Sequence, residues 1–388
     1  MAMGPSELGK VLEIFEQNFR NRGELGASVS VWCDGVELLC EGHGWCEREK
    51  IRPWTSQTLV PVYSATKVPA AATLLTALES RGLTAATPVS EIWPKFPLPT
   101  AEIAHLLSHQ CGLAILDRAA DVLVHKEVVA AIEAQAPAWE LDTGHGYHPR
   151  TFGALTDELV RRLIGKSLGV YWREMIADPL ALDFWIGLPE SLWPRVAQLY
   201  SGKLSQAHSA DEFYQQLNTQ GTFTRRAFSS PRGLHSVQEM NSPLAWAGGL
   251  PAFGGVGTAS ALAKFYQAAI GSIESPLSPM VRKSLATPQS TGDDFVLLRH
   301  TTFTCGAQQD PRDESGRKIR HIYGPSLSAF GHPGAGGSHG FGDPETGISF
   351  AYVMNQMELT VMPSVKCMTW PSRSKRKAPC CWQATKPC

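Results

Sequence analysis

The segment Ser64-Ala65-Thr66-Lys67 places a hydroxyl and an amine at a spacing suited to nucleophilic catalysis. It follows the apolar run 59–63 and opens a stretch with helical periodicity. A hydroxyl at a helix N-terminus lies near unsatisfied N–H groups and the positive end of the helix dipole, which favour developing negative charge. Lys67 would share that helix face, and burial in an apolar site would let its amine lose its proton. The pair therefore predicts acyl transfer, with Ser64 as nucleophile and Lys67 as its base.

Chance is the competing explanation for this motif. The spacing S-x-x-K occurs four times in the chain, at Ser64, Ser315, Ser372 and Ser374. The last three lie in polar or tail sequence with no apolar helix after them. An N-cap serine followed by a surface lysine would give the same pattern at Ser64.

Two other segments could complete such a site. Tyr147 lies in a loop just before a helical pattern, and a tyrosine beside an ammonium can ionise below its ordinary pKa of about 10 and relay a proton. The alternative is a loop aromatic that covers the helix start. The glycine-dense segment 331–337 permits close backbone approach to a ligand, and a free N–H there could stabilise an oxyanion. A flexible turn is the alternative for that segment.

Ser338 is a rival nucleophile, because Gly336-Gly337-Ser338-His339-Gly340 fits the pattern G-x-S-x-G. That motif requires a strand, a sharp turn and then a helix. Here Asp343-Pro344 and another strand-like run follow, so the context predicts that Ser338 is not the nucleophile.

Metal, cofactor and nucleic-acid chemistry have little support in the sequence. His105 and His109 are four residues apart, but the glutamate of H-E-x-x-H is absent, and no dinucleotide-binding or Walker glycine pattern is present. The chain has 35 Lys+Arg against 36 Asp+Glu, a formal charge of −1 that gives no electrostatic basis for binding nucleic acid or an anionic membrane. We expect no cofactor, no metal and a small-molecule substrate; the oligomeric state is not indicated.

The expected cellular location follows from features that are absent from the 388-residue sequence. No apolar run approaches the roughly 18 residues of a membrane span, and the first residues do not resemble a secretory signal. The nine cysteines are an odd number without a C-x-x-C pair. We therefore expect no membrane association and a reducing, cytoplasmic setting.

The expected fold is α+β. Helical periodicity over 6–22 is followed by two strand-like runs around Asp34-Gly35, and strand-like runs return at 326–330 and 348–354. We predict one antiparallel sheet, built from N- and C-terminal parts and flanked by helices, with a mostly helical lobe inserted. The predicted units are 1–83 with 236–357 for the sheet, 84–235 for the lobe, and 358–388 as an irregular tail.

Taken in order, these segments resemble motifs of the serine β-lactamase-like superfamily, which includes penicillin-binding enzymes, AmpC-type β-lactamases and carboxylesterases. Five segments, spread over roughly residues 8–357, are similar to its signatures. They are Ser64-Ala65-Thr66-Lys67 (S-x-x-K), His105 to Leu113 (L-L-[ST]-H-x-S-G-L, with Cys111 in the serine place), Tyr147-His148-Pro149 (Tyr-x-Asn), Trp246-Ala247-Gly248-Gly249 (the later Gly-Gly turn) and His332-Pro333-Gly334 (Lys-Thr-Gly). The resemblance implies a serine β-lactamase-like fold and roles for the matching residues.

Two departures indicate the esterase branch, the family VIII carboxylesterases. Pro149 replaces the asparagine and His332 replaces the lysine, so two polar groups that would hold a β-lactam are absent. The resemblance implies catalytic residues Ser64, Lys67 and Tyr147, oxyanion-binding N–H groups of Ser64 and Ala335, and a substrate pocket with Pro149, His332 and Gly334. The expected activity is hydrolysis of short-chain carboxylic esters through an acyl-enzyme, with weak β-lactamase side activity.

Three alternatives stay open. A class C-like β-lactamase or a D-alanyl-D-alanine peptidase would use the same residues. A catalytically silent binding protein on this scaffold is disfavoured, because it has no need of Ser64, Lys67 and Tyr147 together. An α/β-hydrolase acting through Ser338 is the third.

Overall fold

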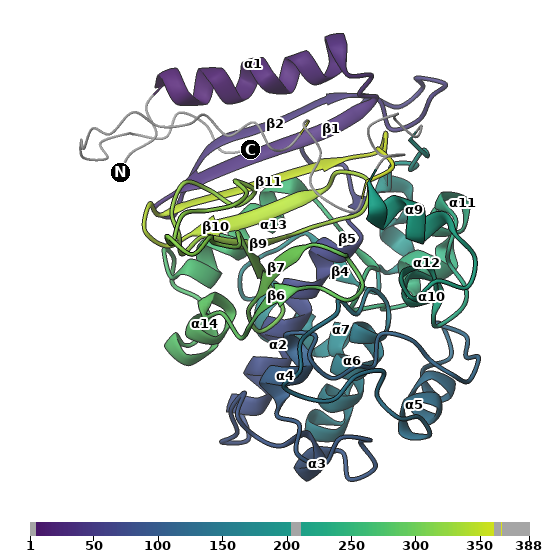
Figure 1. The fold of residues 1–388 in the computed structure, drawn as a ribbon. Helices are drawn as coiled ribbons and strands as arrows, with labels where there is room; N and C mark the ends of the chain where they lie inside the picture. The colour runs from purple at the N-terminus through teal and green to yellow at the C-terminus, as the bar shows by residue number, and fades with distance from the viewer. Residues whose placement is uncertain (1–4, 203–210, 361–365, 367–388) are drawn as a thin grey trace.

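An eight-stranded antiparallel sheet is the main feature of the computed structural model, which describes residues 5–202, 211–360 and 366 (Figure 1). Its strand order is β2-β1-β11-β10-β9-β8-β7-β6. The strands are β1 (Gly26–Cys33), β2 (Val36–Gly44), β6 (Ser290–Asp293), β7 (His300–Phe303), β8 (Gln308–Gln309), β9 (Phe330–Pro333), β10 (His339–Asp343) and β11 (Ile348–Met354). Because β1 pairs with β11, the N- and C-terminal parts of the chain share one sheet, which confirms the predicted fold class.

Helices cover both faces of this sheet. On one face lies α1 (Pro5–Asn21), whose Phe15 ring meets the Tyr352 ring of β11 at 6.2 Å. On the other lies α13 (Ala259–Ile270), which accepts a hydrogen bond from Ser349 of the same strand. Successive side chains of a strand point to opposite faces, so β11 is buried along its whole length.

The predicted hairpin is confirmed between β1 and β2. Asp34 and Gly35 have φ of 48° and 83°, the left-handed conformation that a two-residue turn of this kind requires.

The remaining helices lie below and beside the large sheet (Figure 1). A second, three-stranded sheet in the order β3-β5-β4 lies among them. Its strands are β3 (Val60–Pro61), β4 (Phe184–Ile186) and β5 (Gly255–Gly257). The helices are α2 (Lys67–Glu79), α3 (Val89–Ile92), α4 (Ile103–Leu107), α5 (His125–Glu133), α6 (Thr151–Ile164), α7 (Leu168–Trp172), α9 (Glu212–Asn218), α10 (Phe223–Ser229), α11 (Val237–Met240), α12 (Pro243–Ala247) and α14 (Pro279–Ala286). α2 packs against α6, α7 and α14, so the helix that follows the candidate nucleophile is central.

One predicted strand is wrong. Residues 326–329 form a turn, and only Phe330 belongs to β9. The reason is Asp343, whose carboxylate accepts hydrogen bonds from the N–H and the hydroxyl of Ser326 and holds that segment in the turn. Of the predicted tail 358–388, residues 361–365 and 367–388 lie outside the described residues. The division into sheet units and lobe stays a prediction.

Candidate active site

Ser64 lies where β3 turns into α2. A single turn of 3-10 helix, Ser64–Thr66, joins the two elements. The residue before it, Tyr63, has φ 49° and ψ −132°, a conformation that is costly for a bulky side chain and that recurs at functional sites. Thr66 holds this turn, because its hydroxyl donates to the Tyr63 carbonyl and accepts from the Gly255 N–H of β5. The strained turn leaves Ser64 half-buried at the edge of a cavity.

Lys67 lies behind Ser64 and has no exposed surface. Its Nζ is 3.2 Å from Ser64 Oγ, 2.9 Å from the Pro149 carbonyl oxygen and 2.8 Å from the Ala252 carbonyl oxygen. Burial, and then the positive charge of Arg150, lower the pKa of this amine well below 10.5. Its environment therefore favours the neutral amine, and the surface-lysine alternative does not describe it.

Tyr147 lies on the other side of Lys67, whose Nζ is 4.8 Å from the centre of the tyrosine ring. The side chain is 4% exposed and makes a side-chain hydrogen bond with Ser64. Burial raises the pKa of Tyr147 above 10, and the nearby Asp294 carboxylate adds to the increase. The expectation that a neighbouring ammonium would ionise this tyrosine is therefore wrong, because desolvation has the larger effect and opposes the charged form.

Asp294 positions Tyr147 and belongs to none of the sequence motifs described above. Its carboxylate is buried and accepts the backbone N–H of Tyr147, with both oxygens at 3.1 Å. Oδ1 also accepts the N–H groups of Val296 at 2.8 Å and Leu297 at 2.7 Å. Burial raises the pKa of Asp294 to about 6 in spite of these hydrogen bonds. The only sequence signal was an acid pair before an apolar run, which is typical of many loops.

The segment after β9 comes close to the Ser64 turn. Gly334 is packed so tightly that a Cβ atom there would lie 2.0 Å from the Val62 carbonyl oxygen. Its N–H donates to the Ser338 carbonyl, and the Gly336 N–H donates to the Thr360 carbonyl. The Ala335 N–H between them has no acceptor among the described residues. Ala335 and Ser64 both line the same cavity, as expected for two oxyanion donors.

This cavity, of about 680 Å³, is called the active-site cavity below. Pro149 lines it. The large apolar side chains in its lining are Leu217, Phe228, Leu234, Val237, Phe253, Met357 and Leu359. Its charged or titratable lining includes Arg150, Arg225, Arg232, His235 and one acid, Glu358. The volume lies within the roughly 300–1,000 Å³ of ordinary small-molecule sites.

His332 and Gly334 are not among the residues that line this cavity, and neither are Lys67 and Tyr147. The assignment of His332 and Gly334 to the substrate pocket stays a prediction. His332 is fully buried, with its ring centre 5.8 Å from that of Tyr147, and its Nδ1 is 2.8 Å from the Pro333 carbonyl oxygen. Burial lowers the pKa of His332 to about 3, so it contributes a neutral ring next to the tyrosine. Gly334 has no side chain, and this lets the segment after β9 approach the Val62 carbonyl closely.

Two more buried histidines surround Tyr147. The His148 N–H donates to His109 Nδ1, and the two rings are stacked at 5.4 Å. His148 Nε2 accepts the Leu113 N–H, while its Nδ1 lies 2.7 Å from the Gly146 carbonyl oxygen. Burial lowers the pKa of His148 to about 3 and also lowers that of His109. His109 and Leu113, which follow Leu106-Leu107-Ser108, thus hold the loop that carries Tyr147.

Ser338 has no solvent-accessible surface, and strand β10 follows it instead of a helix. The structure therefore gives no support to the α/β-hydrolase alternative. Ser315 lies in an exposed turn, and Ser372 and Ser374 lie outside the described residues.

Neither a metal site nor a membrane span is found in the part of the chain that the structure describes. No three His, Cys, Asp or Glu side chains there are placed to hold an ion. None of the described helices is both long and apolar enough to cross a membrane.

Comparison with known proteins identifies the family of this chain. A family model described as Beta-lactamase matches residues 14–364. The chain belongs to the beta-lactamase family. This family member is 31% identical over 361 residues to the esterase/beta-lactamase LipL of Mycobacterium tuberculosis, covering 89% of this chain and 81% of LipL.

Two solved structures are similar to this beta-lactamase family chain over almost its whole length. A penicillin-binding protein homologue from Caulobacter crescentus has a TM-score of 0.79 and 30% identity, covering 95% of this chain and 96% of the homologue. A family VIII carboxylesterase has a TM-score of 0.81 and 28% identity, covering 94% and 96%. The predicted superfamily is confirmed, and the chain belongs to a family of hydrolases that includes esterases.

Proposed function

We propose that this chain is a carboxylesterase that forms an acyl-enzyme on Ser64 and prefers esters with short acyl groups. The observation that carries the proposal is the set of three contacts made by Lys67 Nζ. A neutral amine has two N–H groups and one lone pair. With the N–H groups donated to the carbonyl oxygens of Pro149 and Ala252, the lone pair is left for the Ser64 hydroxyl at 3.2 Å.

The proposed reaction follows from this arrangement. Ser64 Oγ attacks the ester carbonyl carbon, and its proton moves to Lys67 Nζ. The carbonyl oxygen becomes an oxyanion held by the N–H groups of Ser64 and Ala335. The oxyanion then collapses and the bond between the carbonyl carbon and the alcohol oxygen breaks; Tyr147, protonated at rest, donates its proton to that oxygen and takes up the proton held by Lys67. Water attacks the acyl carbon, its proton passes by way of Lys67 to Ser64 Oγ as the bond to that oxygen breaks, and the acid is released. Loss of one oxyanion donor typically raises such a barrier by about 2.7–4 kcal/mol.

The preference for esters over β-lactams rests on polar groups that the chain lacks. Pro149 offers no side-chain amide, and its carbonyl oxygen already accepts from Lys67. His332 is buried, and burial lowers its pKa to about 3, so it offers a substrate carboxylate no positive charge of the kind that a lysine there would supply. A β-lactam would find neither the amide nor the lysine that the family motifs have at these two positions, whereas a small apolar acyl group needs neither.

The test is a hydrolysis panel of p-nitrophenyl acetate, butyrate and a long-chain ester beside a chromogenic cephalosporin. We expect the highest kcat/KM for the short esters. A higher kcat/KM for the cephalosporin than for the butyrate ester would favour a β-lactamase instead. Ser64→Ala should abolish ester hydrolysis, and Ser338→Ala, the matched control, should retain most of it. The reverse result would reject Ser64 as the nucleophile.

A further inference from the structure

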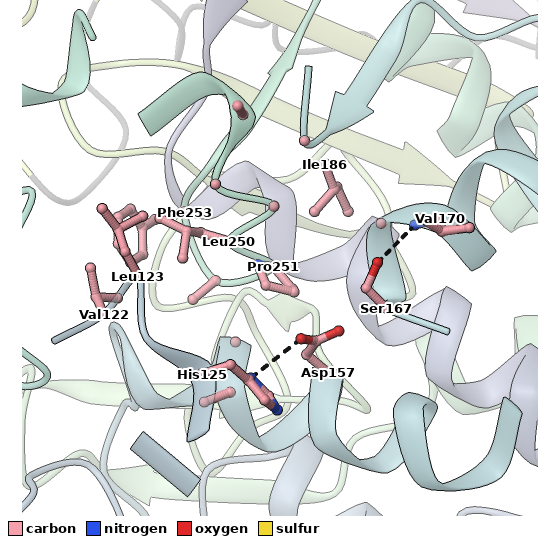
Figure 2. Close-up of a pocket in the computed structure, with 18 of the residues that line it drawn as sticks. Val122, Leu123, His125, Asp157, Ser167, Val170, Ile186, Leu250, Pro251 and Phe253 are labelled. Carbon is pink, nitrogen blue, oxygen red and sulfur yellow. Dashed lines mark hydrogen bonds and ion pairs between the residues drawn. The ribbon is translucent and has the colours of Figure 1, made fainter. Parts of the chain in front are cut away.

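A second cavity, of about 510 Å³, lies on the far side of the wall that supports Lys67. It is enclosed by α5, α6, α7, the end of β4 and the segment 247–253, and is called the lobe cavity below (Figure 2). Ser64, Lys67 and Tyr147 do not line it. The lobe cavity and the active-site cavity share only Arg150 and Phe253, which stack with the guanidinium 4.6 Å from the ring centre. That stacked pair separates two distinct sites.

One side of the lobe cavity is apolar. Figure 2 shows Leu123, Leu250 and Phe253 together on this side. Leu123 is 38% exposed, and Val170, at another edge of the cavity, is 48% exposed. Large apolar side chains that remain open to solvent around a hollow indicate a surface made for an apolar group.

The other side is basic. Arg150, Arg161, Arg173 and His125 line the cavity, and Asp157 is its only acidic lining residue in the described part of the chain. The Asp157 carboxylate is already occupied, because it accepts the Leu168 N–H at 2.6 Å and Arg161 Nε at 2.8 Å and lies 3.3 Å from His125 Nδ1. Figure 2 shows this His125–Asp157 pair opposite the apolar side.

Several N–H groups that line the lobe cavity are available to bind an anion. Arg161 uses only Nε within the protein, so its two terminal nitrogens have no partner among the described residues, and its side chain is 43% exposed. The N–H groups of Gly249 and Leu250, both on the cavity wall, also lack an acceptor in the described ranges. Gly248 is right-handed and Gly249 is left-handed, with φ of −65° and 58°, a sequence that turns successive N–H groups toward one anion.

We propose that the lobe cavity binds an apolar carboxylate, with the chain against Leu123, Leu250 and Phe253 and the carboxylate on the basic side at Arg161. This proposal goes beyond the proposed function and does not depend on it, because the short-chain acids that the enzyme would release are less apolar than such a ligand.

The test is isothermal titration calorimetry with octanoate, which needs no turnover and so is independent of the proposed function. Val170→Glu places a negative charge at the edge of the lobe cavity, at an exposed position near the start of α7. Leu217→Glu does the same in the active-site cavity and is the matched control. We expect Val170→Glu to weaken binding about tenfold or more, because like charges repel, and Leu217→Glu to leave it unchanged. Absence of binding to the unmodified protein, or weakening by Leu217→Glu alone, would overturn the proposal.

Two further titrations test the carboxylate. Octan-1-ol, which has the same chain without the charge, should bind more weakly than octanoate. Arg161→Gln should weaken binding of octanoate and leave octan-1-ol unaffected. Equal affinity for the acid and the alcohol, with no effect of Arg161→Gln, would reject recognition of the carboxylate.

Discussion

Asp294→Asn offers a quantitative test of how the tyrosine loop is held. In the folded protein the pKa of Asp294 is raised from 3.8 to about 6, chiefly because the carboxyl group is buried. A raised pKa means that the folded state binds the proton more tightly than the unfolded state. The resulting stability is fully present below about pH 4 and is lost as the pH rises through about 6.

The size of the effect follows from the shift. A difference of about two pKa units corresponds to about 3 kcal/mol, since each unit is 1.36 kcal/mol. In Asp294→Asn the group cannot titrate, while asparagine Oδ1 can still accept from Tyr147, Val296 and Leu297. The wild-type protein should therefore lose up to about 3 kcal/mol of unfolding free energy relative to the variant between about pH 4 and about pH 8.

The assay is chemical unfolding of both proteins across this pH range, followed by subtraction of the two curves. Titration of every other group cancels where its environment is unchanged. Turnover of the short ester provides the functional readout, and it should be retained because the Tyr147 N–H keeps an acceptor. A difference that stays constant with pH would show that folding does not raise the pKa of Asp294 and would refute the reasoning.

Three further results are expected. Tyr147→Phe should lower kcat and kcat/KM together by roughly 10²- to 10⁴-fold, since a proton relay acts in the transition state; a variant with half its turnover would exclude that role. The value of kcat/KM should rise with pH as Lys67 loses its proton and then stay level to about pH 10. Arg150→Met should move this rise to higher pH, because it removes a positive charge that lowers the pKa of Lys67. Arg150→Lys keeps the charge and should leave the rise where it is. Gly334→Ala should cost about 1–3 kcal/mol of unfolding free energy, since the new Cβ would overlap the Val62 carbonyl; an unchanged denaturation midpoint would contradict that packing.

The sequence was most informative where geometry is local. Ser64 and Lys67 are three positions apart at a strand-to-helix turn, so their proximity follows from helix periodicity alone. The Asp34-Gly35 hairpin was predictable for the same reason. Tyr147 was predicted from the order of the family motifs, because it is too far along the sequence for any local pattern to connect it with Ser64 and Lys67.

The rest depended on tertiary packing. Asp294 lies 147 positions from Tyr147, and no local pattern connects the two. Pro149 and Ala252 contribute backbone carbonyls, which every residue has and no motif marks. The pKa of Tyr147 was expected to fall because a charge was known to be near, but only the structure shows that burial outweighs it.

Pro149 has a role in the structure that its side chain does not indicate. In the sequence it replaces an asparagine and so lacks a side-chain amide. In the structure its backbone carbonyl oxygen is one of the two that accept hydrogen bonds from Lys67. The residue after it is Arg150, and the residue after Ala252 is Phe253; these two side chains stack on each other. Arg150 is in turn fixed by the carbonyls of residues 231, 233 and 234. The stack therefore fixes the positions of both carbonyls, while the charge of Arg150 favours the neutral amine that they orient toward Ser64.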